Sequence, residues 1–169
     1  MRTLSTTEAL IVRWNELCRD QSLRDLPYRI ELTASGKLEM SAMNVRRGIL
    51  QAALTTQLKE QLPDGVVFMN CPVVTAIGVR VPSVAWASAT FMATQGSSEV
   101  FKRAPDICAE IDEPDIEQKV PAYLGAGAKE VWSVSEQGAL RYFTREGERT
   151  HSEFPVHVIL PLAMKGIQS

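Results

Sequence analysis

Residues 105–119, PDICAEIDEPDIEQK, join a short apolar strand pattern to an unusually dense run of charge. Six of the twelve residues from Asp106 to Glu117 are acidic, and Lys119 follows them closely. Because side chains alternate along a strand, Asp106 and Glu110 project from one face and the aliphatic residues from the other. A carboxylate inside such a strand needs a cation, a hydrogen-bond donor or a metal ion.

The acidic run has two interpretations. In the first, Glu110 and a nearby carboxylate supply oxygen ligands for Mg²⁺ or Mn²⁺, while the Lys119 ammonium orients water or stabilises phosphate charge. In the second, the carboxylates form a solvated acidic loop, because clusters of this kind are common on protein surfaces and perturb one another without function. The spacing alone does not choose between them.

The composition is that of one ordinary globular domain, with 169 residues, 45% of them hydrophobic and 22% charged. Lys and Arg number 18 against 20 Asp and Glu, and the formal net charge is -2. This balance excludes the broad basic surface of a protein that coats nucleic acid, although it leaves room for a local basic groove. A chain of this length buries roughly 70% of its unfolded surface, so a bound metal would be functional.

The three cysteines, Cys18, Cys71 and Cys108, are far apart and lack the spacing of a zinc site or a disulfide framework. We predict reduced thiols in the core. The chain contains no run of about 18 apolar residues, which excludes a transmembrane helix and a membrane partner. Because the N-terminus also lacks the apolar stretch of a signal peptide, we expect a cytoplasmic protein.

The first third of the chain predicts two helices separated by a β-hairpin. Ser5 and Glu8 form a capping box, which predicts a helix over 6–20. Alternating residues on both sides of a glycine turn predict hairpin strands at 28–32 and 38–40. Apolar residues at intervals of three to four then predict a long helix, with Asn44 as its N-cap and a Pro-Asp-Gly stop after residue 62.

Short β-branched and apolar runs interrupted by Pro or Gly predict three neighbouring strands after the long helix, at 66–69, 76–81 and 84–87. Beyond them we predict short helices at 89–94 and 116–124 and strands at 106–111, 131–134, 140–143 and 157–160. Because proline is tolerated only in a first helical turn, Pro121 also allows the second helix to begin near Lys119.

No internal repeat, low-complexity tract or linker interrupts the chain, so we predict one domain spanning residues 1–169. It would consist of an N-terminal helix and hairpin, a core, and closing strands with a tail, at 1–43, 44–134 and 135–169. Arg46 and Arg47, at the start of the long helix, are candidates for phosphate contacts, with a solvated helix face as the alternative.

The order helix, three strands, helix and strand, with an acidic strand residue and a downstream lysine, resembles the core of the PD-(D/E)XK nucleases. More specifically, the chain resembles the Uma-two family of restriction-endonuclease-like proteins over roughly residues 8 to 145. The resemblance rests on GVRVPSVAW at 78–86, APDICAEI at 104–111, Lys119, Tyr123, GAKEVW at 127–132, YRIEL at 28–32 and Leu50-Gln51. It implies an α/β fold with a restriction-endonuclease-like core, in which helices flank a mixed central β-sheet and an N-terminal helix and hairpin are added.

The family resemblance also implies Mg²⁺-dependent hydrolysis of DNA phosphodiesters. One carboxylate comes from an Arg-x-Pro-Asp segment, a second from a Pro-Asp-x-x-x-Glu strand, and a lysine lies downstream. Here Glu110 matches the second carboxylate, as catalytic residue and metal ligand, and Lys119 matches the lysine. The lysine is displaced, because Asp112 occupies its usual place two residues after the glutamate. Ser83 stands where the first carboxylate is expected, and a neutral hydroxyl is a poor Mg²⁺ ligand.

These departures lead to two expectations about function. One is a Mg²⁺- or Mn²⁺-dependent DNA endonuclease with a degraded site at Ser83, in which Asp106 or Asp112 replaces the lost carboxylate as a metal ligand. The alternative is a catalytically inactive module of the same fold that binds DNA or a protein partner. The resemblance and the exposed strands also favour a homodimer.

Overall fold

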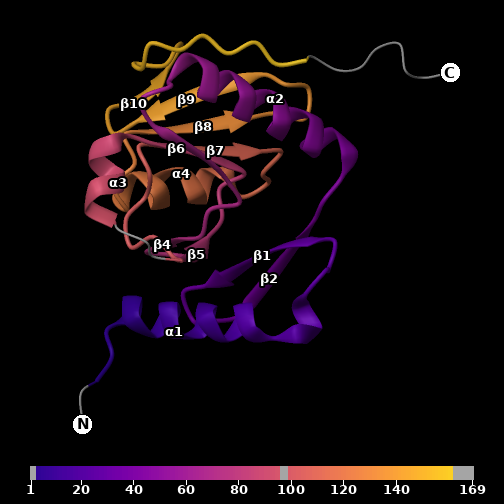
Figure 1. The fold of residues 1–169 in the computed structure, drawn as a ribbon, viewed down its shortest axis with the longest axis vertical. Helices are drawn as coiled ribbons and strands as arrows, with labels where there is room; N and C mark the ends of the chain where they lie inside the picture. The colour runs from indigo at the N-terminus through magenta and orange to yellow at the C-terminus, as the bar shows by residue number, and fades with distance from the viewer. Residues whose placement is uncertain (1–2, 96–98, 162–169) are drawn as a thin grey trace, which may run out of the picture.

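The structure is a computed structural model that describes residues 3–95 and 99–161. Two β-sheets with helices packed on them make up the fold (Figure 1). A four-stranded sheet lies against the N-terminal helix, and a six-stranded mixed sheet lies between the long helix and two shorter ones. The predicted α/β class, with a mixed sheet flanked by helices and an N-terminal helix and hairpin, is confirmed.

The N-terminal elements are those that the sequence predicts. Helix α1, Thr6–Arg19, begins at the Ser5 capping box, in which the backbone N–H of each of Ser5 and Glu8 donates to the other's side chain. A short 3-10 turn, η1, follows at Gln21–Leu23, and the hairpin consists of β1, Tyr28–Thr33, and β2, Leu38–Ala42. The inner face of α1 packs on this sheet through Leu10, which lies against Leu32 and Val79.

The four-stranded sheet joins the hairpin to two strands from the middle of the chain. Its order is β2-β1-β5-β4, with all pairs antiparallel, and the added strands are β4, Val73–Thr75, and β5, Gly78–Arg80. Gly78 has a φ of 120°, and a Cβ there would lie 2.0 Å from the Leu32 carbonyl oxygen. Glycine therefore permits the close approach of β5 to β1.

One prediction about this region is wrong: the run 76–81 does not neighbour the strands at 66–69 and 84–87. Instead β5 pairs with β1 and β4, while β3, Val66–Met69, and β6, Val84–Ala87, pair with each other in the other sheet. Pro82 has no N–H to donate to a ladder, so the chain leaves one sheet there and enters the next after Ser83.

The six-stranded sheet has the order β10-β9-β8-β7-β6-β3 and contains one parallel pair, β7 and β8. A helix, α4, makes the crossover between these two strands, which is the usual connection for parallel neighbours. The further bounds are β7, Ile107–Ile111; α4, Ile116–Gly125; β8, Glu130–Val134; β9, Leu140–Thr144; and β10, Gly147–Arg149. Helix α4 begins at Ile116, so Pro121 lies in its interior and Lys119 lies inside the helix.

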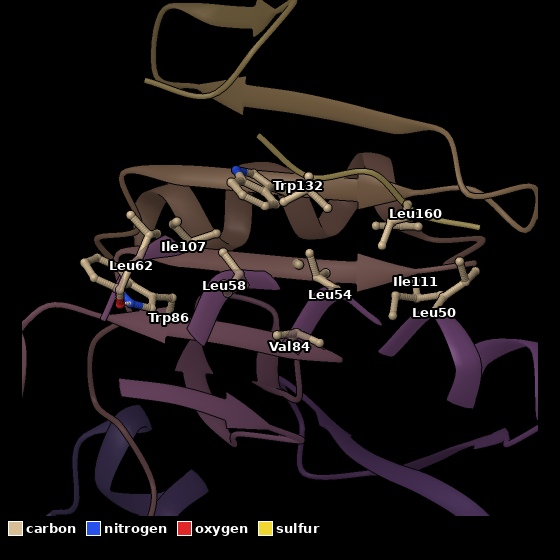
Figure 2. Close-up of a cluster of buried hydrophobic side chains, with 13 residues drawn as sticks. Leu50, Leu54, Leu58, Leu62, Val84, Trp86, Ile107, Ile111, Trp132 and Leu160 are labelled. Carbon is tan, nitrogen blue, oxygen red and sulfur yellow. Dashed lines mark hydrogen bonds between the residues drawn. The ribbon is translucent and has the colours of Figure 1, made fainter. Parts of the chain in front are cut away.

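Helix α2, Val45–Gln61, covers one face of this sheet. The Asn44 side chain caps it by accepting a hydrogen bond from the Arg47 N–H. Leu50, Leu54 and Leu58 recur every four residues, are fully buried, and face β6, β7 and β8 (Figure 2). The opposite face packs against α3, Ala89–Gln95, and α4. The predicted long helix and the packing of its apolar face on the sheet are therefore confirmed.

The predicted closing strand at 157–160 is wrong, because β10 closes the sheet instead. The segment runs over α2, where the side-chain amides of Gln57 and Gln61 each donate to one backbone carbonyl and accept from one backbone N–H, at Ile159 and His157 respectively. These amides take the place of a neighbouring strand. The backbone N–H and C=O groups of His157 and Ile159 therefore form hydrogen bonds without a neighbouring strand.

The structure also tests the predicted burial of the cysteines and the expected absence of a transmembrane helix. Cys71 and Cys108 are buried free thiols as predicted, whereas Cys18 is exposed on α1, so its assignment to the core is wrong. Across the described ranges, none of the helices has the length and apolarity needed to cross a bilayer. The cytoplasmic location and the division into segments 1–43, 44–134 and 135–169 stay predictions.

Candidate functional site

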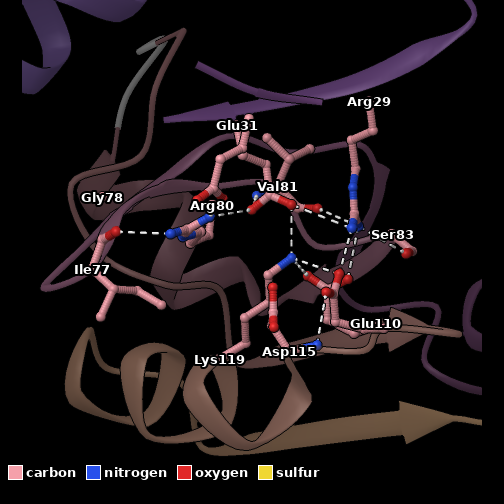
Figure 3. Close-up of polar contacts among 12 residues, drawn as sticks. Arg29, Glu31, Ile77, Gly78, Arg80, Val81, Ser83, Glu110, Asp115 and Lys119 are labelled. Carbon is pink, nitrogen blue, oxygen red and sulfur yellow. Dashed lines mark hydrogen bonds and ion pairs between the residues drawn. The ribbon is translucent and has the colours of Figure 1, made fainter. Parts of the chain in front are cut away.

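Glu110, near the end of β7, is fully buried and lies where the two sheets meet (Figure 3). Its Oε2 accepts a hydrogen bond from Nη1 of Arg29 at 2.8 Å, and its Oε1 accepts one from the Tyr123 hydroxyl at 2.7 Å. The Lys119 Nζ lies 3.5 Å from the same Oε1. Both oxygens of Glu110 are therefore occupied by donors.

Lys119 comes from α4 and is 2% exposed. Its Nζ lies 2.7 Å from Oε1 of Glu31 and 2.7 Å from Oε2 of Glu113. The sequence-predicted pair of Glu110 and Lys119 is thus brought together, within a larger set of charges than the sequence suggested. We call this set the Glu110 cluster, and its members are Arg29, Glu31, Ser83, Glu110, Glu113, Lys119 and Tyr123.

Arg29 lies at the centre of the cluster. Besides Glu110, its Nη1 donates to the Val81 carbonyl at 3.1 Å and lies 3.5 Å from the Ser83 hydroxyl. Its Nη2 binds the carboxylates of Glu31 and Glu113. A guanidinium therefore occupies a position surrounded by carboxylate, carbonyl and hydroxyl oxygens, which are the ligand types that a hard divalent ion would use.

The local sequence explains how these groups meet. Arg29 and Glu31 alternate along β1, so both side chains leave the sheet on the face opposite α1, while Leu32 packs toward α1. Ser83 lies in the crossing from β5 to β6, and its hydroxyl accepts a hydrogen bond from the Ile111 N–H at 3.3 Å. The cluster is consequently assembled by placing β1 against segments that follow it by more than 50 residues in the chain.

The charges of the cluster shift its pKa values in opposite directions. Burial raises the pKa of Glu31, and the charge of Glu110 adds to that rise despite the neighbouring Lys119 and Arg29. Burial acts to raise the pKa of Glu113 as well, but its hydrogen bond and ion pair with Lys119 outweigh that effect, and its pKa is lowered. Burial and the charge of Glu110 raise the pKa of Tyr123, so its hydroxyl stays a proton donor.

Arg47, in the first turn of α2, is half-buried at the rim of the cluster. Its Nη2 lies 3.5 Å from the Ser83 hydroxyl. Within the described residues no carboxylate lies within 4.0 Å of its guanidinium, and burial together with the charge of Arg29 lowers its pKa. It lines a cavity of about 110 Å³ with the polar side chains of Asn44, Gln51 and Asn70. We call these four side chains the Arg47 rim.

The other predicted phosphate contact, Arg46, is not at the cluster. Its guanidinium donates to the carbonyl oxygens of Glu136 at 2.9 Å and Pro161 at 2.7 Å. Neighbouring positions in a helical turn point in different directions, which is why only one of the two arginines reaches the site. Arg46 instead attaches the segment before residue 162 to the start of α2.

The structure places Asp106 outside the Glu110 cluster. Its carboxylate accepts a hydrogen bond from the Ser88 N–H at 2.7 Å and forms an ion pair with Lys129. Asp106 and Glu110 do share a strand face, but four residues of strand separate their Cα atoms by about 13 Å. Burial opposes the lowering of the Asp106 pKa, which follows from its contacts with Ser88 and Lys129. The two carboxylates cannot hold one ion in this arrangement.

Asp112, the other proposed replacement ligand, is exposed just after β7. Its φ of 47° turns the chain, and its N–H donates to the Val134 carbonyl at 2.8 Å. None of the contacts that define the Glu110 cluster involves its carboxylate. The acidic side chain that does enter the cluster from this run is Glu113, the next residue, because the turn redirects the chain toward Lys119.

Sequence reasoning missed four members of the cluster: Arg29, Glu31, Glu113 and Tyr123. The signal for the first two was present, since two charged residues alternate in a strand whose other face is apolar. That pattern normally means a solvated face, and only the packing of the hairpin sheet over the end of β7 buries it. Glu113 was part of the acidic run, and Tyr123 was noted only for the family resemblance.

The residues present do not fit a bound divalent ion. Across residues 3–95 and 99–161, no group of three or more His, Cys, Asp or Glu side chains is arranged to hold a metal. Ser83 supplies a neutral hydroxyl where a carboxylate is expected, and the Arg29 guanidinium already neutralises Glu110. A dication would have to displace a buried cation that has three carboxylate partners.

The mixed sheet has one parallel pair, its crossover helix carries a buried lysine, and the first strand of the pair carries a buried glutamate, which is the α/β arrangement that the family resemblance predicted. Comparisons with known proteins identify the family and the fold. The sequence model of the Uma2 family, described as "Putative restriction endonuclease", matches residues 15–168, so the chain belongs to this family. No curated protein matches the sequence.

A solved structure shows the same fold. The crystal structure of a putative nuclease belonging to DUF820 from Anabaena variabilis ATCC 29413 superposes with a TM-score of 0.66. The two sequences are 14% identical, and the match covers 94% of this chain and 90% of that one. At this identity the likeness establishes the shared fold.

Proposed function

We propose that this Uma2-family protein binds nucleic acid phosphate at the Arg47 rim and that its hydrolytic centre is closed by Arg29. The observation that carries the proposal is the position of the Arg29 guanidinium, among Glu110 Oε2, the Val81 carbonyl and the Ser83 hydroxyl. An internal cation at this point supplies the charge that an ion would otherwise bring. Within the Glu110 cluster, Arg29 and Lys119 balance two of the three carboxylates without a metal, and the Arg29 guanidinium leaves no open coordination position at Glu110.

Energetics support a closed centre. Breaking a buried ion pair by removing one partner costs about 3–5 kcal/mol, because the other charge is left uncompensated. A divalent ion at Glu110 would compensate that carboxylate itself, but it would deprive the buried Arg29 guanidinium of this partner, place more positive charge beside it, and gain only a neutral hydroxyl at Ser83 in return. Weak metal affinity follows from these two facts together.

The Arg47 rim supports the binding half of the proposal. A half-buried cation whose pKa is lowered by burial and by a second arginine favours an anion beside it. The rim is also lined by the first turn of α2, and the N-terminal end of a helix carries a partial positive charge. A phosphate of a nucleic acid backbone suits this chemistry, because guanidinium groups bind it with two parallel hydrogen bonds.

Metal affinity and cleavage test the closed centre. Calorimetric titration of Mn²⁺ into the wild type should show no stoichiometric binding, and plasmid DNA should stay uncut with Mn²⁺ or Mg²⁺. The double variant Arg29→Met/Ser83→Asp should gain Mn²⁺ binding, while Ser83→Asp alone, which keeps Arg29, should not. Wild-type cleavage that disappears in Glu110→Gln would overturn the proposal.

Duplex binding tests the rim separately. Fluorescence anisotropy with a labelled oligonucleotide should show weaker binding by Arg47→Ala and a shallower dependence on salt, because one phosphate contact is lost. Arg149→Ala is the matched control, since it removes an exposed arginine on β10, in the other sheet from Arg29. Equal affinity in the wild type and Arg47→Ala would exclude the rim as the phosphate site.

A second candidate is the Mg²⁺-dependent DNA endonuclease implied by the family pattern. It is favoured by one observation, the convergence of Glu110 and Lys119 within 3.5 Å despite the displaced lysine. In that case Arg29 would be expelled when DNA and metal bind together. Cleavage by the wild type, with losses in both Glu110→Gln and Lys119→Met, would favour this candidate over the closed centre.

A further inference from the structure

The hairpin leaves one sheet edge open. In the four-stranded sheet the two edges are β2 and β4. Strand β4 is fully buried and is continued by a bridge between Val73 and Phe101, whereas β2 pairs only with β1 among the described residues. The outer edge of β2 is therefore open in the described part of the chain.

The hydrogen-bond pattern shows which groups of β2 point outward. The Thr33 N–H donates to the Lys37 carbonyl at one end of the ladder, and the Met43 N–H donates to the Pro27 carbonyl at the other. Because bonded and non-bonded pairs alternate in an antiparallel ladder, the residue pair at Met40 is a non-bonded one. The N–H and C=O of Leu38, Met40 and Ala42 consequently face away from β1.

Apolar side chains gather beside this edge. Ten large hydrophobic side chains are exposed in the described residues, and half of them lie between residues 26 and 45. The five residues are Leu26, Tyr28, Met40, Met43 and Val45. Met40 lies in β2 itself, the register places Tyr28 opposite Ala42, and the bond from Met43 to Pro27 extends the pairing beyond the end of β2.

Strand β2 also lacks the features that protect free edges. It contains no lysine, proline or bulge, and its one charged residue, Glu39, is neutralised by an ion pair with Arg80. The polar edge strand β10, by contrast, is fully exposed and has the sequence Gly-Glu-Arg. An edge of neutral backbone flanked by apolar side chains is suited to pairing with another strand.

We propose that β2 pairs with β2 of a second copy of this chain, antiparallel and centred on Met40. In this register Leu38 faces Ala42 of the other copy, and Glu39 faces Ser41, so no like charges meet. The strand is thus complementary to itself, which is the requirement for a two-fold interface. This inference does not rest on the proposed nucleic-acid binding.

The pairing would have a consequence for the site. Glu39 and Ser41 project on the same side of the sheet as Arg29 and Glu31, and they line a cavity of about 310 Å³ that also includes Lys119. Joining two β2 strands would continue the four-stranded sheet into its copy. The cavities of both copies would then open on one side of a single sheet, next to the two-fold axis.

Sedimentation velocity of the full chain tests the interface. The wild type should sediment at twice the chain mass of 18.7 kDa. Met40→Pro removes an outward N–H without touching the bonds to β1, so it should sediment as a monomer, as should Met40→Lys, which places two lysines face to face. Met40→Val keeps the N–H and should stay dimeric. A monomeric wild type, or a dimer that persists in Met40→Pro and Met40→Lys, would overturn the proposal.

Disulfide trapping fixes the register. In a Cys18→Ser background, which removes the exposed native thiol, Met40→Cys should form an intermolecular disulfide because the facing Cα atoms lie about 5.5 Å apart. Ala42→Cys is the matched control, since its copies would lie about 14 Å apart along the strands and should not cross-link. Cross-linking of Ala42→Cys in preference to Met40→Cys would contradict the register.

Discussion

Two buried glutamates lie on the parallel neighbours β7 and β8 and differ in everything but burial. Glu110 is 0% exposed and Glu130 is 1% exposed. Glu130 accepts hydrogen bonds from Nε1 of Trp132 and the hydroxyl of Ser152, both at 2.7 Å, and from the N–H of Glu153 at 2.6 Å. All three donors are neutral, and among the described residues no ion pair involves Glu130. Glu110 instead meets two cations and a phenol.

The difference shows that burial of a carboxylate does not by itself indicate a functional site. Neutral donors from its own strand and from residues 152–153 satisfy Glu130, which is a structural solution. Glu110 instead lies in a cluster whose other charged side chains come from β1, from α4 and from the loop after β7. The strand register places Glu130 opposite Ile107 and Glu110 opposite Ser133, so the two lie toward opposite ends of the parallel pair. Ligands of parallel α/β sheets bind at the carboxyl ends of the strands, where Glu110 lies.

The largest expected effect is that of Glu110→Ala on stability. The substitution leaves Arg29 and Lys119 buried with one carboxylate fewer, and we expect it to lower the free energy of unfolding by about 3–5 kcal/mol. Urea unfolding measures the change. Glu110→Gln keeps an acceptor for the Tyr123 hydroxyl and should cost less. Equal losses in the two variants would show that the lost charge, not the lost acceptor, causes the effect, and a Glu110→Gln variant as stable as the wild type would show that charge is not what distinguishes this glutamate.

The matching change on the other strand should cost less. Glu130→Ala leaves the Trp132, Ser152 and Glu153 donors without their acceptor, at about 1–3 kcal/mol, since no charge is left uncompensated. The same urea titration measures it. Duplex binding should be unchanged, because Glu130 lies at the other end of the strand pair. A loss larger than that of Glu110→Ala would reverse the comparison.

Acid should separate two members of the Glu110 cluster. The pKa of Glu113 is lowered below its ordinary value of 4.5, so the unfolded state takes up this proton first and stability falls as the pH drops below that value. Glu113→Gln should flatten the fall. The pKa of Glu31 is raised, so its protonation favours the folded state in acid and Glu31→Gln should steepen the fall. Thermal unfolding from neutral to acidic pH measures how stability depends on pH in the wild type and in both variants, and a change of this slope in the same direction in the two variants would contradict the assignment.

The smallest effects are expected for the two serines that accompany these glutamates. Ser152→Ala removes one donor to Glu130, and Ser83→Ala removes the acceptor of the Ile111 N–H, so each should cost about 1 kcal/mol. Only Ser83→Ala should also change duplex binding, because its hydroxyl lies beside Arg47. A change in binding by Ser152→Ala instead would place the phosphate contact elsewhere.

Local patterns predicted the elements well where one residue determines a boundary or a face. The capping box at Ser5, the N-cap at Asn44 and the leucines of α2 mark their helices because each acts within one or two turns. The same reasoning misplaced the strand at 76–81, since pairing partners depend on where the chain crosses between sheets at Pro82. It also predicted a strand at 157–160, where Gln57 and Gln61 replace a ladder.

By itself the sequence determined the helices, most of the strands, the family, and the pair of Glu110 and Lys119. These features depend on residue types and on their spacing over a few positions, which the sequence states directly. Only the tertiary structure decided which charges surround that pair. Arg29 and Glu31 lie about 80 residues from Glu110 along the chain, and Asp106, four residues from it, lies outside the cluster. The reason is physical: a buried charge is stabilised by whatever the fold brings within a few ångströms, and sequence distance does not measure that.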